Sequence, residues 1–112
     1  MKELENILAL DKKIRNIAKF GYDGKLIEYL DSNKNSVPDK KLQKSFGMNM
    51  VILSDVHKNL NNGFGDVSVE ISIRPENISM IFYNNSIYSV SVNSHSDYSK
   101  LVENISKLLS KN

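Results

Sequence analysis

The two histidines, His57 and His95, are the side chains in this sequence with the widest range of chemistry. Neither has a second histidine or a carboxylate at the spacing of a metal-binding motif, so the sequence predicts no zinc or iron site. The run Ser94-His95-Ser96-Asp97 contains the residue types of a catalytic triad, but residues packed into one turn cannot converge as a triad requires. We therefore expect His95 in a turn that enters a helix, and His57 partly exposed on a helix.

The other residue types with catalytic potential give weak signals. Gly63-Phe64-Gly65 is glycine-rich, but phosphate-binding loops lead from a strand into a helix N-terminus, whereas this segment leaves a helix. The acidic residues are scattered, and the chain has no cysteine for thiol catalysis. The sequence thus predicts a non-enzymatic protein with no catalytic, cofactor-binding or metal-binding residues. A small enzyme is the alternative, and it would require His57, His95 and nearby acids to converge in a cleft.

The composition is that of a folded globular domain. Of the 112 residues, 40% are hydrophobic and 25% are charged, which suits one domain over residues 1–112. The net charge is +2 and the only arginines are Arg15 and Arg74, which argues against nucleic-acid binding because arginine makes the bidentate contacts to phosphate and guanine. The acidic start, Met1 to Glu5, is unlike a signal peptide, and no apolar run reaches the ~20 residues that span a bilayer. We expect a cytoplasmic protein without a membrane span.

Hydrophobic periodicity predicts a short helix and a hairpin in the first thirty or so residues. Leu4, Ile7 and Leu8 are spaced for one face of a helix that ends near Leu10. Strands are predicted over residues 14–20 and 26–30, joined by a turn at Asp23-Gly24. Their apolar positions alternate poorly, so we expect both strands to be central and covered on both faces.

A long helix is predicted to follow, starting near Pro38 in a capping-box-like segment. Its apolar positions recur at helical spacing through about five turns, and Gly63 is predicted to cap its end in the left-handed conformation. Gly47 inside the helix would allow another backbone to approach closely, unless it is there by chance. The apolar positions are Leu42, Phe46, Met50, Leu53, Val56 or His57, and Leu60, with Val51 and Ile52 widening the stripe.

Three strands and a final helix complete the predicted architecture. Residues 67–74 and 88–93 alternate apolar and polar side chains, and a strand over residues 77–83 lies between them. Asn84-Asn85 suits a tight hairpin before the last strand because asparagine tolerates positive φ. A helix then runs from Ser94 or Ser96 to about Leu109. The fold class expected is α+β, an α/β sandwich in which a five-stranded antiparallel sheet is flanked by helices.

The order helix-strand-strand-helix-strand-strand-strand-helix, with Asp23-Gly24-Lys25-Leu26-Ile27 in the first hairpin, resembles the roadblock/dynein light chain family within the profilin-like group. The resemblance covers nearly the whole chain. The closing stretch, Ile78 to Leu109, is also similar to small archaeal roadblock-like proteins. Members of the family typically form homodimers or heterodimers by pairing the third strand across an extended sheet and packing the long helices together.

The resemblance implies a dimeric, non-catalytic platform that binds or regulates a small Ras-like GTPase, or that scaffolds a signalling or motility complex. The edge strand over residues 67–74 lacks internal proline and lysine, which suits pairing with a second copy, although its side chains could instead point into the chain's own core. No residue matches an arginine finger by motif. The dimer-interface prediction is Phe46, Gly47, Met50, Val67, Val69 and Ile71.

A small-molecule sensor is the alternative function from a different class. A profilin-like fold could enclose a ligand between its sheet and helices, in a cavity lined by aromatic side chains. The residues predicted to line it are Phe20, Tyr22, Tyr29, Phe82 and Tyr88.

Overall fold

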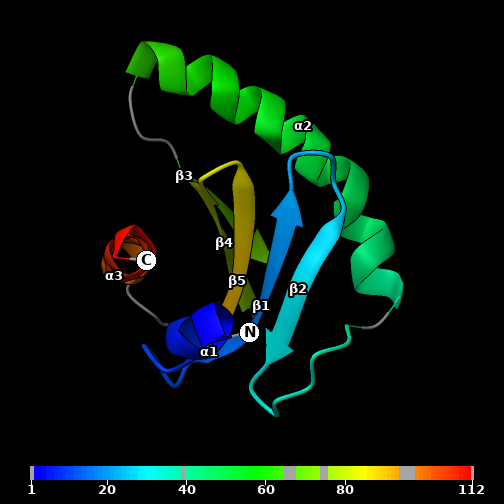
Figure 1. Cartoon of the computed structure of the whole chain (residues 1–112), viewed down its shortest axis with the longest axis vertical. Helices are drawn as coiled ribbons and strands as arrows, with labels where there is room; N and C mark the ends of the chain where they lie inside the picture. Colours follow the sequence, from blue (N-terminus) through cyan, green and yellow to red (C-terminus); the bar gives the residue numbers. More distant parts are fainter. Residues whose placement is uncertain (1, 39, 65–67, 74–75, 94–97, 112) are drawn as a thin grey trace.

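The computed structural model describes residues 2–38, 40–64, 68–73, 76–93 and 98–111. Within these ranges the chain forms three helices and five strands (Figure 1). The elements along the chain are α1 (Lys2–Leu8), β1 (Ile14–Gly21), β2 (Leu26–Asp31), α2 (Lys40–Phe64), β3 (Ser68–Ile73), β4 (Glu76–Tyr83), β5 (Ser86–Asn93) and α3 (Tyr98–Ser110).

The strands form one antiparallel sheet in the order β2-β1-β5-β4-β3. The α+β class and the antiparallel sheet predicted from the sequence are confirmed. Ile17 in β1 pairs with Leu30 of β2 on one side and with Val90 of β5 on the other. The prediction that both strands of the first hairpin are central is wrong for β2, because β5 returns to the open side of β1 and leaves β2 outermost. The other edge of the sheet is β3.

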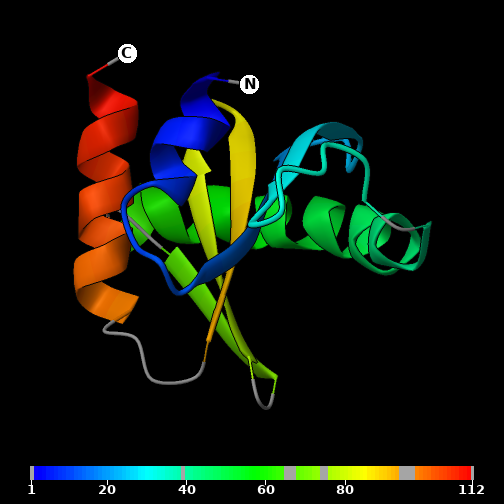
Figure 2. The same ribbon diagram turned by 90° about the horizontal axis from the view of Figure 1, so that it is seen from below.

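Helices cover both faces of the sheet. Figures 1 and 2 show α2 across one face and α1 with α3 on the other. The buried apolar side chains accordingly form two clusters, one on each face of the sheet. The first joins α1 and α3 to the sheet through Leu4, Ile7, Leu101 and Ile105, which are all buried. The second joins α2 to the sheet and includes the fully buried Met50.

β5 is buried along nearly its whole length. Every residue from Ser86 to Val92 is buried, including both serines that follow Tyr88 in the alternating pattern. Because successive side chains point to opposite faces, Ser89 lies on the same face as Ile87, which belongs to the cluster under α2. The alternation of apolar and polar residues in β5 therefore reflects two buried faces that differ in polarity. It does not mark one buried face and one solvent-exposed face.

The two hairpin turns form as their sequences predict. Asn84 and Asn85 have φ angles of 52° and 60°, the left-handed values that asparagine tolerates and a type I′ turn requires. In the first hairpin Gly24 has a φ of 84°, and the Asp23 carboxylate accepts a hydrogen bond from the Lys25 backbone N–H at 3.0 Å. The residues within each turn thus determine where the chain reverses direction in both hairpins.

α2 is longer than the sequence suggests. Its 25 residues extend about 37 Å, and it continues through Gly63, which therefore lies inside the helix and does not cap it. The predicted left-handed cap at Gly63 is wrong, because glycine is tolerated within a helix at a cost of only about 0.5–1 kcal/mol. The turn predicted around His95 and the segments at Gly65, Val67 and Arg74 lie outside the described residues.

Candidate interaction surface

α2 carries apolar side chains on two faces, and one of them is exposed. Ile52, Val56 and Leu60 are spaced four residues apart, which places them along one side of the helix. Their exposed fractions are 55%, 39% and 37%. We call these three residues the outer stripe of α2. Isolated exposed apolar residues are ordinary, but a contiguous row on a helix marks a surface suited to contact with another protein.

The opposite side of α2 is fixed to the sheet. Met50 is fully buried and Ser54 is 2% exposed, and Leu53 packs at the border of the same cluster. The Ser54 hydroxyl donates to the Val51 carbonyl at 2.7 Å, an intrahelical bond that satisfies this buried group. Ile52 lies nearly opposite Met50 around the helix, so the outer stripe begins on the side away from the sheet, and Val56 and Leu60 continue it along the flank of the helix.

His57 joins α2 to the sheet through its ring. The imidazole stacks on Phe82 of β4 with ring centroids 4.2 Å apart and planes inclined by 7°. Its Nδ1 lies 3.1 Å from the Tyr22 hydroxyl, and burial raises the pKa of Tyr22. Lys58 lies over the Tyr22 ring at 5.2 Å. These contacts give His57 a structural role in docking the helix, since stacking and hydrogen bonding occupy the ring.

On the other face, Glu3 holds α1 against the sheet. Its carboxylate accepts a hydrogen bond from the Tyr88 hydroxyl at 2.6 Å and forms an ion pair with the Lys19 ammonium at 3.3 Å. Burial, together with the bond to Glu3 and the negative charges of Glu3 and Glu28, raises the pKa of Tyr88 far above its usual range. This network stabilises the fold by joining α1 to β1 through Lys19 and to β5 through Tyr88.

The dimer-interface residues predicted from the sequence fall into two groups. Met50 is fully buried within the chain, in the cluster between α2 and the sheet. Phe46 and Gly47 lie on α2, and Val69 and Ile71 lie on the edge strand β3. For these four residues the interface stays a prediction, as it does for Val67, which is outside the described residues.

Sequence reasoning missed the outer stripe of α2 as a separate surface. The sequence pattern places Val56 and Leu60 in the same apolar row as Met50, whereas in the structure Met50 is buried and the other two are exposed on the flank of the helix. The available signal was the spacing of Ile52, Val56 and Leu60 by four residues, a second row beside the one through Met50 and Leu53.

The aromatic residues predicted to line a ligand cavity do not share a space. Phe20, Tyr22, Tyr29 and Phe82 belong to the cluster beneath α2. Tyr88 belongs to the cluster beneath α1 and α3, on the other face of the sheet. The single aromatic cavity predicted for a sensor is therefore wrong, because the β-sheet separates its proposed walls.

Two further properties concern the part of the chain that the structure describes. Its histidines and acids form no group of three or more that could hold a metal ion. None of its helices is both long and apolar enough to cross a membrane.

Solved structures with low sequence identity share this architecture. A roadblock/LC7 domain from Streptomyces avermitilis superposes with a TM-score of 0.72 at 10% identity, over 98% of this chain and 91% of that one. The chain has the roadblock/LC7 fold. MglB from Myxococcus xanthus shares the fold with a TM-score of 0.72 at 9% identity, over 98% of this chain and 90% of that one.

An MglB in a tetrameric arrangement has the roadblock/LC7 fold as well, with a TM-score of 0.70 at 9% identity over 95% of this chain and 78% of that one. No protein-family profile matches the sequence, and no curated protein does. The predicted likeness to roadblock proteins is confirmed for the fold, and the similarity to archaeal members stays a prediction. At these identities the fold is shared, whereas function has to be argued from the surface.

Proposed function

We propose that this chain is a non-catalytic, dimeric interaction module of the cytoplasm, which regulates or scaffolds a small Ras-like GTPase or a signalling complex. The observation that carries the proposal is the outer stripe of α2. A row of three exposed apolar side chains on a helix whose other side is already buried gives a surface that a second protein can cover.

A second copy of the chain suits this surface. In a two-fold symmetric dimer the same patch meets itself, so an apolar row along a helix is complementary to its own symmetry mate. The strand β3 adds a second element, since it lies at the sheet edge and is paired on one side by β4. An open edge can pair with the same strand of another molecule and extend the sheet. The tetrameric arrangement of the MglB neighbour supports assembly beyond one chain.

The partner proposed for the dimer supplies the nucleotide chemistry itself. The resemblance to the roadblock family carries the expectation of a Ras-like GTPase, and the scarcity of arginine fits a role without a catalytic arginine finger. The His57 ring, the candidate for chemistry in the described chain, is engaged by Phe82 and Tyr22. Together these features favour a platform over an enzyme.

The proposal is tested by solution mass, measured by size-exclusion chromatography with light scattering over a wide concentration range. We expect twice the chain mass of 12.7 kDa for the unmodified protein. Ile52→Lys places a charge in the outer stripe and should yield monomers. Ile27→Lys is the matched control, because Ile27 is similarly exposed, at 51%, but lies on β2 at the other edge of the sheet.

A strict monomer at all concentrations would refute the homodimer. Dissociation by both substitutions would refute the assignment to α2. With the dimer established, binding of purified small GTPases in their GDP and GTP-analogue states would test the partner class, and equal absence of binding in both states would refute GTPase regulation.

A further inference from the structure

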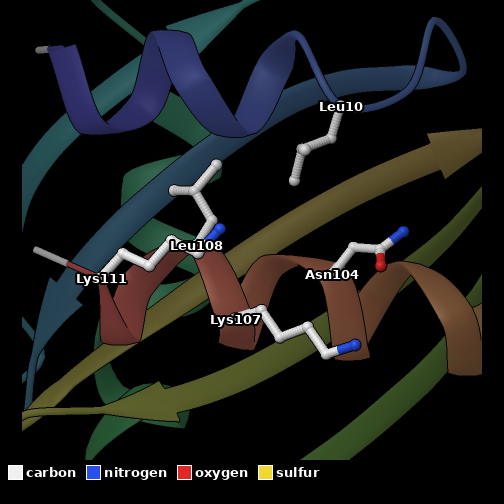
Figure 3. Close-up of a pocket in the computed structure, with 5 residues that line it drawn as sticks. All are labelled: Leu10, Asn104, Lys107, Leu108 and Lys111. Atoms are coloured by element: carbon white, nitrogen blue, oxygen red, sulfur yellow. The ribbon is translucent and has the colours of Figure 1, made fainter.

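A groove lies on the other layer of the molecule, between the segment that follows α1 and the last turns of α3. Its volume is about 290 Å³, and it is lined by Leu10, Asn104, Lys107, Leu108 and Lys111. Figure 3 shows Leu10 and Leu108 extending toward each other across the gap, with Lys107 of α3 and Lys111, the first residue after α3, beside them. The groove therefore combines an apolar floor with a basic rim.

The apolar floor is accessible. Leu10 is 40% exposed, and Leu108 is partly buried at the border of the core cluster beneath α1 and α3. Pockets that enclose a drug-sized molecule typically hold about 300–1,000 Å³. An open groove just below that range suits one inserted aliphatic side chain better than an enclosed small ligand.

Two lysines and no acidic residue line the groove, and the Glu103 carboxylate lies next to one of the lysines. Lys107 and Lys111 are one turn apart and exposed. Lys107 pairs with Glu103 at 3.0 Å, but both side chains are more than 60% exposed, so this pair is weak and can exchange for another carboxylate. A lysine in the last helical turn, here Lys107, also offsets the helix dipole, which accounts for its charge but not for the two leucines nearby.

We propose that this groove docks an acidic peptide segment of a partner protein, with one leucine-like side chain between Leu10 and Leu108 and flanking carboxylates on Lys107 and Lys111. The apolar floor provides the anchor, and the lysines provide charge complementarity and orientation. The occupant is a peptide because an exposed groove with a single anchor position fits one side chain of an extended or helical segment.

This site is separate from the surface that the proposed dimer would use. The groove is on the α1 and α3 side of the sheet, whereas the outer stripe is on α2, which covers the opposite face (Figure 2). A dimer formed through α2 would leave both grooves open. The inference therefore goes beyond the proposed function and does not depend on it.

The test uses the full chain and two fluorescein-labelled peptides, each with three glutamates on either side of one central residue. The central residue is leucine in the first peptide and serine in the second, and binding is measured by fluorescence anisotropy. We expect the leucine peptide to bind at least tenfold more tightly. Lys107→Glu with Lys111→Glu should weaken it by about tenfold or more, because two attractive contacts become repulsive.

Two further variants separate a specific site from general attraction. Asn104→Tyr fills the groove without changing its charge. It should reduce the affinity of the leucine peptide to that of the serine peptide. Lys25→Glu with Lys34→Glu makes the same change in net charge at exposed positions in other loops and should have an effect below twofold. Thermal unfolding of each variant confirms that it is folded.

Equal affinity of the two peptides, or equal weakening by both lysine pairs, would overturn the proposal in favour of non-specific electrostatics. Anionic phosphatidylglycerol vesicles serve as the second probe. Co-sedimentation that depends on Lys107 and Lys111, together with no discrimination between the peptides, would also overturn it by identifying a membrane-contacting patch.

Discussion

Tyr88 and Glu3 connect the first helix to the central strand of the sheet, and this bond makes stability depend on pH. The folded chain keeps the Tyr88 proton at pH values where the unfolded chain, with a tyrosine pKa near 10, has begun to release it. The folded state thus binds more protons above that value, so the contribution of Tyr88 is fully present below about pH 10 and is lost as the pH rises further.

We therefore expect the free energy of unfolding to fall between pH 9 and 11, with Tyr88 contributing a slope of up to about 1.4 kcal/mol per pH unit. Tyr88→Phe should flatten this slope. At pH 7 the same variant should lose roughly 1–2 kcal/mol, because a hydrogen bond to a carboxylate is removed while Lys19 still pairs with Glu3. Urea unfolding at each pH measures both effects. Parallel pH profiles for the two proteins would contradict the assignment.

At the scale of elements, the hairpin between β4 and β5 depends on two left-handed residues. Asn84 and Asn85 are both exposed, so their side chains add little packing and their contribution is conformational. Asn85→Ala should lower the free energy of unfolding by about 1–2 kcal/mol, since alanine is strained in the left-handed region. Asn85→Gly should leave it unchanged or raise it by up to about 1 kcal/mol. Chemical denaturation distinguishes the two, and equal losses would refute a conformational cause.

The same elements show which features the sequence could predict. The turns at Asn84-Asn85 and Gly24 were predictable because φ preferences are properties of the residues themselves. The position of β2 at the edge was not, since it depends on where β5 pairs, a choice made by contacts far apart in the chain. The end of α2 was missed at Gly63 because a glycine can be either inside a helix or beyond it.

The candidate surface was predictable only in part for a related reason. Periodicity identifies the apolar positions of α2 and the spacing indicates two rows, but only the packed structure shows that the row through Met50 is buried and the row through Val56 exposed. The groove beside Leu10 was not predictable, because it combines a loop residue with side chains of a helix at the other end of the chain.

For the whole molecule, a dimer couples assembly to folding. If unfolding requires dissociation, mass action raises the melting temperature with protein concentration. We expect an increase of about 5 °C for a hundredfold rise in concentration of the unmodified chain. Ile52→Lys should abolish the dependence and Ile27→Lys should preserve it. Differential scanning fluorimetry or calorimetry over that range measures the shift, and a constant melting temperature for the unmodified chain would argue against a dimer linked to folding.

The pairing of β1 with β5 has a consequence for how the molecule forms. The hairpin β1-β2 and the meander β3-β4-β5 each pair strands that are neighbours in the sequence. The five-stranded sheet is complete only when β1 pairs with β5, for example Ile17 with Val90. Pairing β1 with β5 joins segments that are far apart in the sequence, and the entropy cost of bringing them together slows folding. During synthesis the open side of β1 has no strand to pair with until β5 leaves the ribosome, so the first hairpin is produced well before its final neighbour exists.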